Sequence, residues 1–555
     1  MKQYKTISPD VTIANIRSIL AKNDIATEVL CRSVAGSVFS TRVRLIGDGL
    51  DALNFGTNGK GVSPLYAMAS GYAEFIERLQ TDCLYGRPMV PSMRNYLLPG
   101  EEFKSLSEVR GLLSCYFKKS DVEKYIPSDM QIRVSPMRDL TTGKTYNVPI
   151  ELLRIATGST GCCAGNSAKE AILQGVCEIM ERHSLQKLYA NRNIHIGRIP
   201  EELFVNSASL SRLRKIARDY GLHYEIKNCS ADDGFPVIGL LLWNKTHYKF
   251  KMGCATSPDI ALDRCLAEIF QGCKGCETFN PLNFELMTAS RQNYQNAKLD
   301  GTGHCPCSIF EDGATSDLSS FERFADKDVD GDFACIVQLL ENKGYNVLVQ
   351  DCSYLGFPSF YVYIPGLSDE YSELSDFPYA IVQSRYWSES IPMGWNLSER
   401  RPVVGQEDEY VHMSLPRYNI AYKTSRFPLD LLRTVAAIVN KDYHVAFKWF
   451  SRYLQSFKSQ PSVYCKILRE YLYMRHLNIV PKKAKEILLK AYCEDEAIVE
   501  ELFTDDNVMM ISLPTCFNCE SCPTRSFCRE NNIAKFDRKL MDLHAAWLEN
   551  GASCL

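Results

Sequence analysis

The pattern of apolar and polar positions divides the chain into two regions of different character. Up to about residue 410, short runs rich in β-branched and aromatic residues predict strands, and longer stretches with apolar residues three and four positions apart predict helices. The predicted strands are Val38–Leu45, Val237–Trp243, Tyr345–Gln350 and Phe360–Ile364, and the main predicted helices are Pro64–Gln80, Ser167–Ala190 and Ile260–Thr278. This mixture predicts an α/β or α+β domain over residues 1–410.

The region after residue 427 shows helical periodicity only. Predicted helices at Ala446–Phe457, Val463–Leu477 and Ala484–Ala491 are separated by breaks at Pro461 and Pro481. Paired helices of this length resemble a tetratricopeptide-like module, although no strict repeat of about 34 residues is present. The sequence therefore predicts an all-α helical-repeat region over residues 427–503, followed by a cysteine-rich tail over residues 504–555.

Composition places the chain among folded globular proteins. Hydrophobic residues make up 45% and charged residues 23%, and the formal net charge is −3. This balance gives no overall electrostatic reason to expect nucleic-acid binding. No apolar run approaches the ~20 residues that span a bilayer, and the start MKQYKTISPD lacks an apolar signal core. We therefore expect a cytoplasmic protein that contacts neither membrane nor nucleic acid directly.

The most informative motif is E-x-x-E-R, which occurs twice within predicted helices. Glu74, Glu77 and Arg78 form the first copy, and Glu178, Glu181 and Arg182 the second. Spacing of three places both carboxylates of a copy on one helix face, about 5–6 Å apart at Cβ. Upstream, Glu170 shares a face with Glu181, because eleven residues bring a helix to within about 20° of the same direction.

A third helix adds further polar groups to this set. Arg264, Glu268 and Gln271 recur at spacings of four and three in ALDRCLAEIFQG. One interpretation is a solvated helix face with local ion pairs. The other is a nucleotide site in which Mg²⁺ offsets the clustered carboxylates and arginines bind phosphate. Two copies in apolar helices, with a third polar helix, favour the nucleotide site.

Glycine-rich turns precede both acidic helices and complete a recognisable set of motifs. FGTNGKG comes before SGYAEFIERL, the second copy lies in STGCCAGNSAKEAILQGVCEIMERH, and neither turn is a Walker A motif. With ALDRCLAEIFQG, these stretches resemble the three core signatures of the YcaO family. The resemblance, including a late strand and PG turn at FYVYIPGLSDEY, extends from about Lys5 to Tyr371.

The resemblance implies an enzyme that uses ATP and Mg²⁺ to phosphorylate a backbone amide oxygen. Four glutamates match the family's magnesium-holding positions: Glu74, Glu77, Glu178 and Glu181. Six residues match positions that contact the nucleotide or its phosphates in the family: Lys5, Thr12, Arg78, Asn166, Glu170 and Arg182. Glu268 and Gln271 match the third signature.

The resemblance also leaves alternatives for the product. Azoline-forming members often end in P-x-P-x-P, whereas this chain ends in NGASCL and has a helical C-terminal region. This arrangement is similar to the branch regarded as an accessory factor for β-methylthiolation of a small-subunit ribosomal protein, working with a sulfur-inserting partner enzyme. A peptide maturase forming azolines or thioamides and an ATP-binding scaffold without turnover remain alternatives, and a homodimer is compatible with each.

The 22 cysteines divide into isolated residues and one cluster. Isolated cysteines such as Cys31, Cys115, Cys177, Cys335 and Cys465 are predicted to be small core residues, because free cysteine is often buried. Four cysteines near the end are spaced as metal ligands: Cys516, Cys519, Cys522 and Cys528. They predict a Zn²⁺ site or an iron–sulfur cluster.

Overall fold

The computed structural model describes most of residues 5–109, 131–374 and 434–554. Short gaps occur inside these ranges, and residues 85–96, 110–130, 375–433 and 504–528 lie outside the described part. The chain forms two compact units. Unit 1 comprises Met1–Val382 and Lys535–Leu555, and unit 2 comprises Gln383–Ala534. The boundaries expected near residues 410, 427 and 504 fall within undescribed stretches or at their edge and stay predictions.

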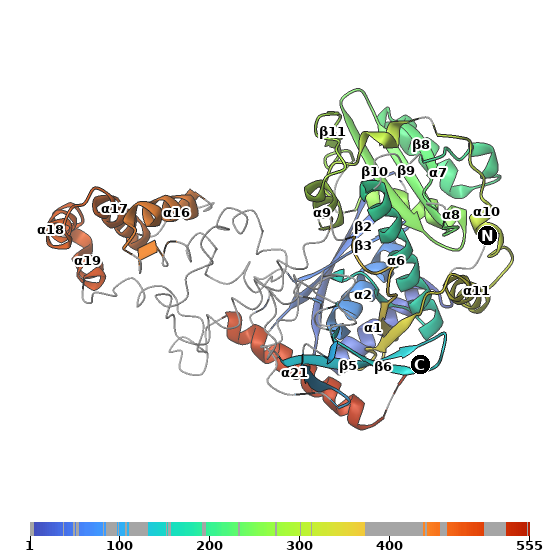
Figure 1. The fold of residues 1–555 in the computed structure, drawn as a ribbon, viewed down its shortest axis with the longest axis horizontal. Helices are drawn as coiled ribbons and strands as arrows, with labels where there is room; N and C mark the ends of the chain where they lie inside the picture. The colour runs from blue at the N-terminus through green and yellow to red at the C-terminus, as the bar shows by residue number, and fades with distance from the viewer. Residues whose placement is uncertain are drawn as a thin grey trace. The chain divides into compact units, whose positions relative to one another are not determined.

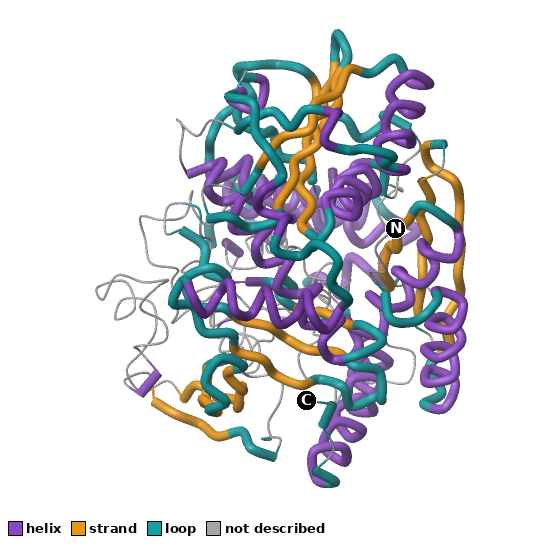
Figure 2. Tube along the Cα trace, turned by 90° about the vertical axis from the view of Figure 1, so that its right-hand side faces the viewer, coloured by secondary structure: helices purple, strands orange, loops and turns teal. Residues whose placement is uncertain are grey.

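The described residues of unit 1 form three antiparallel sheets, which appear as separate groups of strands in Figure 2. One has the order β1 (Ala26–Ala35), β2 (Val38–Ile46), β3 (Gly56–Gly61). Another has the order β11 (Asn280–Pro281), β10 (His247–Cys254), β9 (Val237–Trp243), β8 (His223–Asn228). The largest has the order β4 (Glu102–Ser105), β5 (Gln131–Asp139), β12 (Leu348–Asp351), β13 (Ser359–Tyr363), β7 (Cys162–Ala164), with β6 (Thr145–Val148) paired to β5.

Helices connect and cover these sheets (Figure 1). The longer ones in unit 1 are α1 (Pro9–Lys22), α2 (Pro64–Gln80), α6 (Ala168–Ala190), α7 (Ala208–Tyr220), α8 (Pro258–Ile269), α9 (Arg291–Leu299) and α11 (Val329–Asn342). Short turns of helix are η3 (Glu201–Leu203), η4 (Cys307–Phe310) and α10 (Ser319–Glu322). Helix α6 contacts β7, β13 and β10, and α2 contacts β2, β3 and β7. The two acidic helices are therefore held against three different sheets.

The hydrophobic pattern located several elements closely. Helix α2 and strand β9 have the predicted bounds, and β13 differs by one residue at each end. Helix α8 corrects the prediction: it ends at Ile269 rather than Thr278. Gly275 adopts φ +59°, a left-handed conformation that glycine allows and that a continuing helix excludes. The mixed α/β class expected for this region is confirmed.

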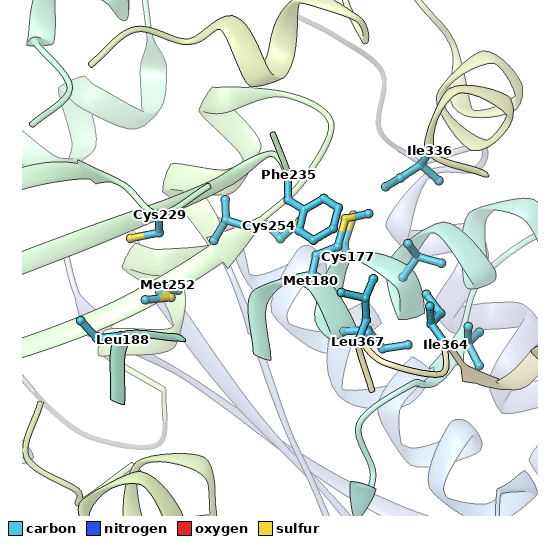
Figure 3. Close-up of a cluster of buried hydrophobic side chains, with 14 of the residues drawn as sticks. Cys177, Met180, Leu188, Cys229, Phe235, Met252, Cys254, Ile336, Ile364 and Leu367 are labelled. Carbon is cyan, nitrogen blue, oxygen red and sulfur yellow. The ribbon is translucent and has the colours of Figure 1, made fainter. Parts of the chain in front are cut away.

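The central core joins α6 to two of the sheets and to α11 (Figure 3). Its buried members include Cys177 and Met180 on α6 and Met252 and Cys254 on β10. Cys177 is fully buried, as predicted. Cys31, Cys335 and Cys465 were predicted to be core residues but are only half-buried. Cys115 lies outside the described residues.

One glycine in the turn before β7 packs against the neighbouring strand. Gly161 has φ +89°, and a Cβ on it would lie 2.1 Å from the Val362 backbone oxygen. Gly143 also has positive φ (+71°), but a Cβ there would meet nothing within 4 Å. We expect Gly143→Ala to lower the free energy of unfolding by about 1–2 kcal/mol, the cost of left-handed backbone. Gly161→Ala should cost an additional ~1–3 kcal/mol from overpacking. Urea denaturation of both variants checks this, and equal losses would contradict it.

Unit 2 is helical throughout its described part. It contains α16 (Tyr443–Gln455), α17 (Val463–His476), α18 (Pro481–Ala491), η6 (Cys493–Asp495) and α19 (Glu496–Leu502). Consecutive helices pack on one another around Ala446, Phe450, Leu468 and Leu488. The helices predicted there are confirmed, whereas their tetratricopeptide-like repeat character stays a prediction. A final helix, α21 (Arg529–Glu549), runs from the end of unit 2 into unit 1.

Among the described residues, no helix combines the length and apolar character needed to cross a bilayer.

Candidate functional site

Helix α2 carries the first acidic group. The helix begins at Pro64 directly after Ser63, whose hydroxyl accepts a hydrogen bond from the Tyr66 amide at 3.3 Å. Near its other end, Arg78 Nη2 lies 3.3 Å from Glu74 Oε1, and Arg78 Nε lies 3.6 Å from Glu77 Oε1. One guanidinium therefore compensates both carboxylates of the first E-x-x-E-R copy.

The second acidic group, on α6, interacts electrostatically with the first. Burial raises the pKa values of Glu178 and Glu77, and Glu74 raises both further by like-charge repulsion. Burial also raises the pKa of Glu181, with a further contribution from Glu178. The structure thus brings the four predicted glutamates into one electrostatic neighbourhood where negative charge is only partly compensated.

A lysine on β3 enters this neighbourhood from the adjacent sheet. Lys60 forms an ion pair with Glu268 on α8, and its Nζ lies 3.4 Å from Gln271 Oε1. Gln271 in turn donates a hydrogen bond to the Asn58 carbonyl on β3. The two predicted residues of the third signature therefore hold Lys60 in place.

The charge of Lys60 acts on both acidic helices. Burial lowers its pKa, whereas Glu74 on α2 and Glu181 and Glu178 on α6 act in the opposite direction. Lys60 was not among the residues selected from the sequence, although it lies within FGTNGKG. A usable signal was its position two residues after Asn58, which places both side chains on the same face of a strand that precedes an acidic helix.

The N-terminal segment forms a second cluster at the start of α6. Glu170 is 3% exposed, and its carboxylate accepts hydrogen bonds from Lys5 Nζ at 3.1 Å, Thr6 N at 2.9 Å and Thr6 Oγ1 at 2.8 Å. Asn166 Nδ2 donates to the same carboxylate at 3.1 Å, and Thr12 Oγ1 donates to Asn166 Oδ1 at 2.9 Å. Burial opposes ionisation, but Lys5 and the Thr6 hydrogen bonds outweigh it and lower the pKa of Glu170.

This N-terminal cluster unites four residues predicted from the sequence: Lys5, Thr12, Asn166 and Glu170. It is separate from the four glutamates, because eleven residues of helix place Glu170 and Glu181 about 16 Å apart along α6. Thr6 contributes two of the contacts to Glu170 and was missed. Its position beside Lys5 was the available signal.

Two cations near the glutamates have polar atoms suited to an anion. Arg182 Nε is buried and has no hydrogen-bond partner, a state that native structures seldom leave uncompensated. Lys251 on β10 interacts with both Glu181 and Arg182. Burial, with repulsion from Lys249 and Arg182, lowers the pKa of Lys251 to about 8. Lys251 was not predicted from the sequence, because β10 and α6 are distant in the chain and come into contact only in the folded structure.

The donor chemistry of the site fits a magnesium nucleotide. Carboxylate oxygens are the side-chain ligands that Mg²⁺ uses, typically with phosphate oxygens and water. Burial raises the pKa values of Glu77, Glu178 and Glu181, which favours a site where cations accompany the charged carboxylates, and the unpartnered Arg182 Nε suits a phosphate oxygen. Within the described residues, no three acidic, histidine or cysteine side chains are spaced as ligands of a single ion.

The predicted zinc or iron–sulfur site lies outside the described residues. Cys516, Cys519, Cys522 and Cys528 all fall within residues 504–528. That metal site stays a prediction.

Comparison with known proteins gives a family match over more than half of the chain. Residues 58–368 match the family model of the YcaO cyclodehydratases, described as ATP- and Mg²⁺-binding. This range includes α2, α6 and α8 and therefore every glutamate discussed above.

A curated relative and two solved structures are similar to part of this chain. The ribosomal protein S12 methylthiotransferase accessory factor YcaO of Escherichia coli is 24% identical over 340 residues, which is 57% of this chain and 58% of that protein. A heterocyclase in complex with substrate and cofactor is 18% identical, covering 67% of this chain and 54% of that one, with a TM-score of 0.49. YcaO from Methanopyrus kandleri, bound with AMPPCP and Mg²⁺, is 18% identical, covering 66% and 93%, with a TM-score of 0.44. The chain thus spans a little over half the length of the curated relative.

Proposed function

Because the chain belongs to the YcaO family, we propose that it binds Mg²⁺ and ATP between α2 and α6 and phosphorylates a backbone amide oxygen of a protein substrate. The observation that carries the proposal is the set of four glutamates from two helices, flanked by Arg78, Arg182 and Lys60. Such a set is electrostatically unfavourable by itself and is compensated by divalent cations together with phosphate.

We assign a role in nucleotide binding to each residue according to its chemistry. The glutamates Glu74, Glu77, Glu178 and Glu181 would hold Mg²⁺. Arg182 would bind a phosphate oxygen, whereas Arg78 keeps the first pair of glutamates oriented. The N-terminal cluster around Glu170 would contact the rest of the nucleotide, and Glu268 with Gln271 orients Lys60.

Bound Mg²⁺ and ATP supply an electrophilic γ-phosphoryl group and charge neutralisation. In the proposed reaction, the amide oxygen attacks the γ-phosphorus and ADP leaves. A nucleophile then adds to the amide carbon, and the oxygen departs as phosphate.

We further propose that this activity assists sulfur modification, specifically β-methylthiolation of a small-subunit ribosomal protein by a sulfur-inserting partner enzyme. Two features support this assignment. The Escherichia coli relative is named an accessory factor of a ribosomal protein S12 methylthiotransferase. In this chain a helical unit follows the region that matches the family.

The first experiment tests nucleotide binding. Isothermal titration of the full chain with ATP should show binding in the presence of Mg²⁺ and a strong loss of affinity in EDTA. Absence of binding with Mg²⁺ would overturn the assignment of the site.

The second experiment tests the chemistry. The chain is incubated with ATP, the ribosomal protein and the sulfur-inserting enzyme, together with a sulfur source, a methyl donor and the redox partner that this enzyme requires. ADP release and the substrate's mass are measured and compared with the same mixture lacking the chain. A gain of one methylthio group supports the accessory role, whereas loss of one water indicates an azoline. ATP binding without ADP release under every condition supports a scaffold and contradicts the enzymatic proposal.

A further inference from the structure

The last helix, α21, carries apolar and aromatic side chains along one face. On α21, drawn in red in Figure 1, Phe536, Leu540, His544 and Trp547 recur at spacings of four and three and so share one side of the helix. Phe536 and Leu540 are each 5% exposed. Lys539 Nζ also donates to the Asp24 carbonyl at 3.3 Å. The C-terminal segment is therefore anchored to unit 1 at several points.

Its last residues contact the connection between β12 and β13. The carboxylate oxygen Asp351 Oδ2 accepts hydrogen bonds from Ser553 Oγ at 2.8 Å and from Cys554 N at 2.7 Å. The His544 ring stacks on Tyr354, with centroids 4.6 Å apart and planes inclined by 14°. The other oxygen, Asp351 Oδ1, accepts from Ser353 N at 3.0 Å. The segment 351–359, which is this connection with one strand residue at each end, is thus ordered from within and contacted by the C-terminal segment at Asp351 and Tyr354.

The same connection holds the end of α2. Tyr354 is 7% exposed, and its hydroxyl donates to the Leu79 carbonyl at 2.9 Å. Gln80 accepts from Leu355 N at 2.6 Å and donates to the Phe357 carbonyl at 2.8 Å. The final carbonyls of a helix lack partners within it, so outside donors of this kind limit fraying. Leu79 directly follows Arg78 and lies two residues after Glu77.

From these contacts we infer that Tyr354 and His544 are positioning residues for the nucleotide site: α21 steadies Tyr354, and Tyr354 fixes the last turn of α2. The inference rests on the proposed role of Glu77 and Arg78 in nucleotide binding. Its physical basis is that a displacement of about 1 Å at a reacting site is costly even when it originates far from the chemistry. A segment nearly two hundred residues after Tyr354 in sequence thereby becomes part of the site's support.

Four variants separate the two links of this contact chain. Tyr354→Phe removes only the hydroxyl that reaches Leu79 and keeps the ring under His544. His544→Ala removes the stacking partner, His544→Phe restores a ring, and the fourth variant combines Tyr354→Phe with His544→Ala. His247→Ala, at an exposed histidine of β10, is the matched control.

Two measurements are made on the full-length chain. Hydrogen exchange of the peptide containing Leu79 and Gln80 should accelerate in Tyr354→Phe and His544→Ala and return to the wild-type rate in His544→Phe. The affinity for ATP with Mg²⁺ should fall about 3- to 10-fold in the first two variants, within the range of coupled contacts. The combined variant should lose no more ATP affinity than the single variant with the larger loss, because both changes interrupt the same series of contacts from His544 to Leu79.

The outcomes distinguish the inference from the proposed function. Unchanged exchange at the end of α2 in His544→Ala overturns the inference, whether or not nucleotide binds. Strictly additive losses in the combined variant also overturn it, because they indicate two independent contacts. Absence of ATP binding in the wild-type chain contradicts the proposed function, whereas the exchange measurement still decides whether α21 supports α2.

Discussion

Replacing Glu178 or Glu181 with glutamine is expected to reduce the affinity for ATP with Mg²⁺ by on the order of 100-fold or more. Glutamine has nearly the shape of glutamate but no charge, so the change removes one proposed ligand without opening a cavity. Removing one partner of a buried charge pair commonly costs about 3–5 kcal/mol, and every ~1.4 kcal/mol is a factor of ten. Isothermal titration of each variant against the wild-type chain measures the effect.

The same variants should make the nucleotide-free protein more stable. Burial raises the pKa values of Glu178 and Glu181 in the folded state. Near pH 7, above the unfolded pKa, an acid with a raised folded pKa opposes folding, so removing its charge should increase the free energy of unfolding. Glu202→Gln, at an exposed position, is the control for both measurements. A decrease in stability together with unchanged nucleotide affinity would indicate that these glutamates form structural ion pairs only.

Local sequence signals were sufficient for the acidic helices. Pro64 and the Ser63 hydroxyl start α2 where the apolar pattern begins, so the helix and the face bearing Glu74 and Glu77 could be predicted together. Strand β9 was equally accessible, because its seven residues are almost all apolar and nearly all buried. In both elements a local pattern is sufficient to predict the bounds that the structure shows.

Contacts between distant segments explain what the sequence did not reveal. Lys60 meets Glu268 only because β3 and α8 pack together more than two hundred residues apart in the chain. Lys251 reaches Glu181 from β10, whose alternation of lysines and apolar residues is equally typical of an ordinary surface strand. Three-dimensional packing, rather than spacing along the chain, places these cations beside the glutamates.

The residues with predicted roles also prove to differ in their surroundings. Glu170 and the glutamates Glu178 and Glu181 lie on one helix, yet burial prevails at the latter two and raises their pKa values. At Glu170, Lys5 and Thr6 reverse that effect. Periodicity could place these residues on α6, but it could not show that the N-terminal segment would fold back onto Glu170. That contact therefore had to come from the structure.

The second large effect is expected at Arg182. Its Nε is buried and has no hydrogen-bond partner. Its positive charge also offsets part of the rise that burial causes in the pKa values of Glu178 and Glu181. Arg182→Lys keeps the charge and so preserves much of this compensation, but it removes the planar fork that can bind phosphate through two nitrogens. We expect a 10- to 100-fold loss of affinity for ATP with Mg²⁺, from about 1.5–3 kcal/mol for a hydrogen bond to a charged group.

The control for Arg182→Lys is Arg218→Lys, the same change at a side chain that is 78% exposed on α7. If the guanidinium binds phosphate, Arg182→Lys should weaken nucleotide binding while leaving the unfolding free energy of the nucleotide-free protein nearly unchanged, because charge compensation of the glutamates survives. If Arg182 serves only to neutralise those glutamates, lysine should replace it without loss of affinity. Titration with ATP and Mg²⁺ therefore separates phosphate recognition from charge neutralisation at a single residue.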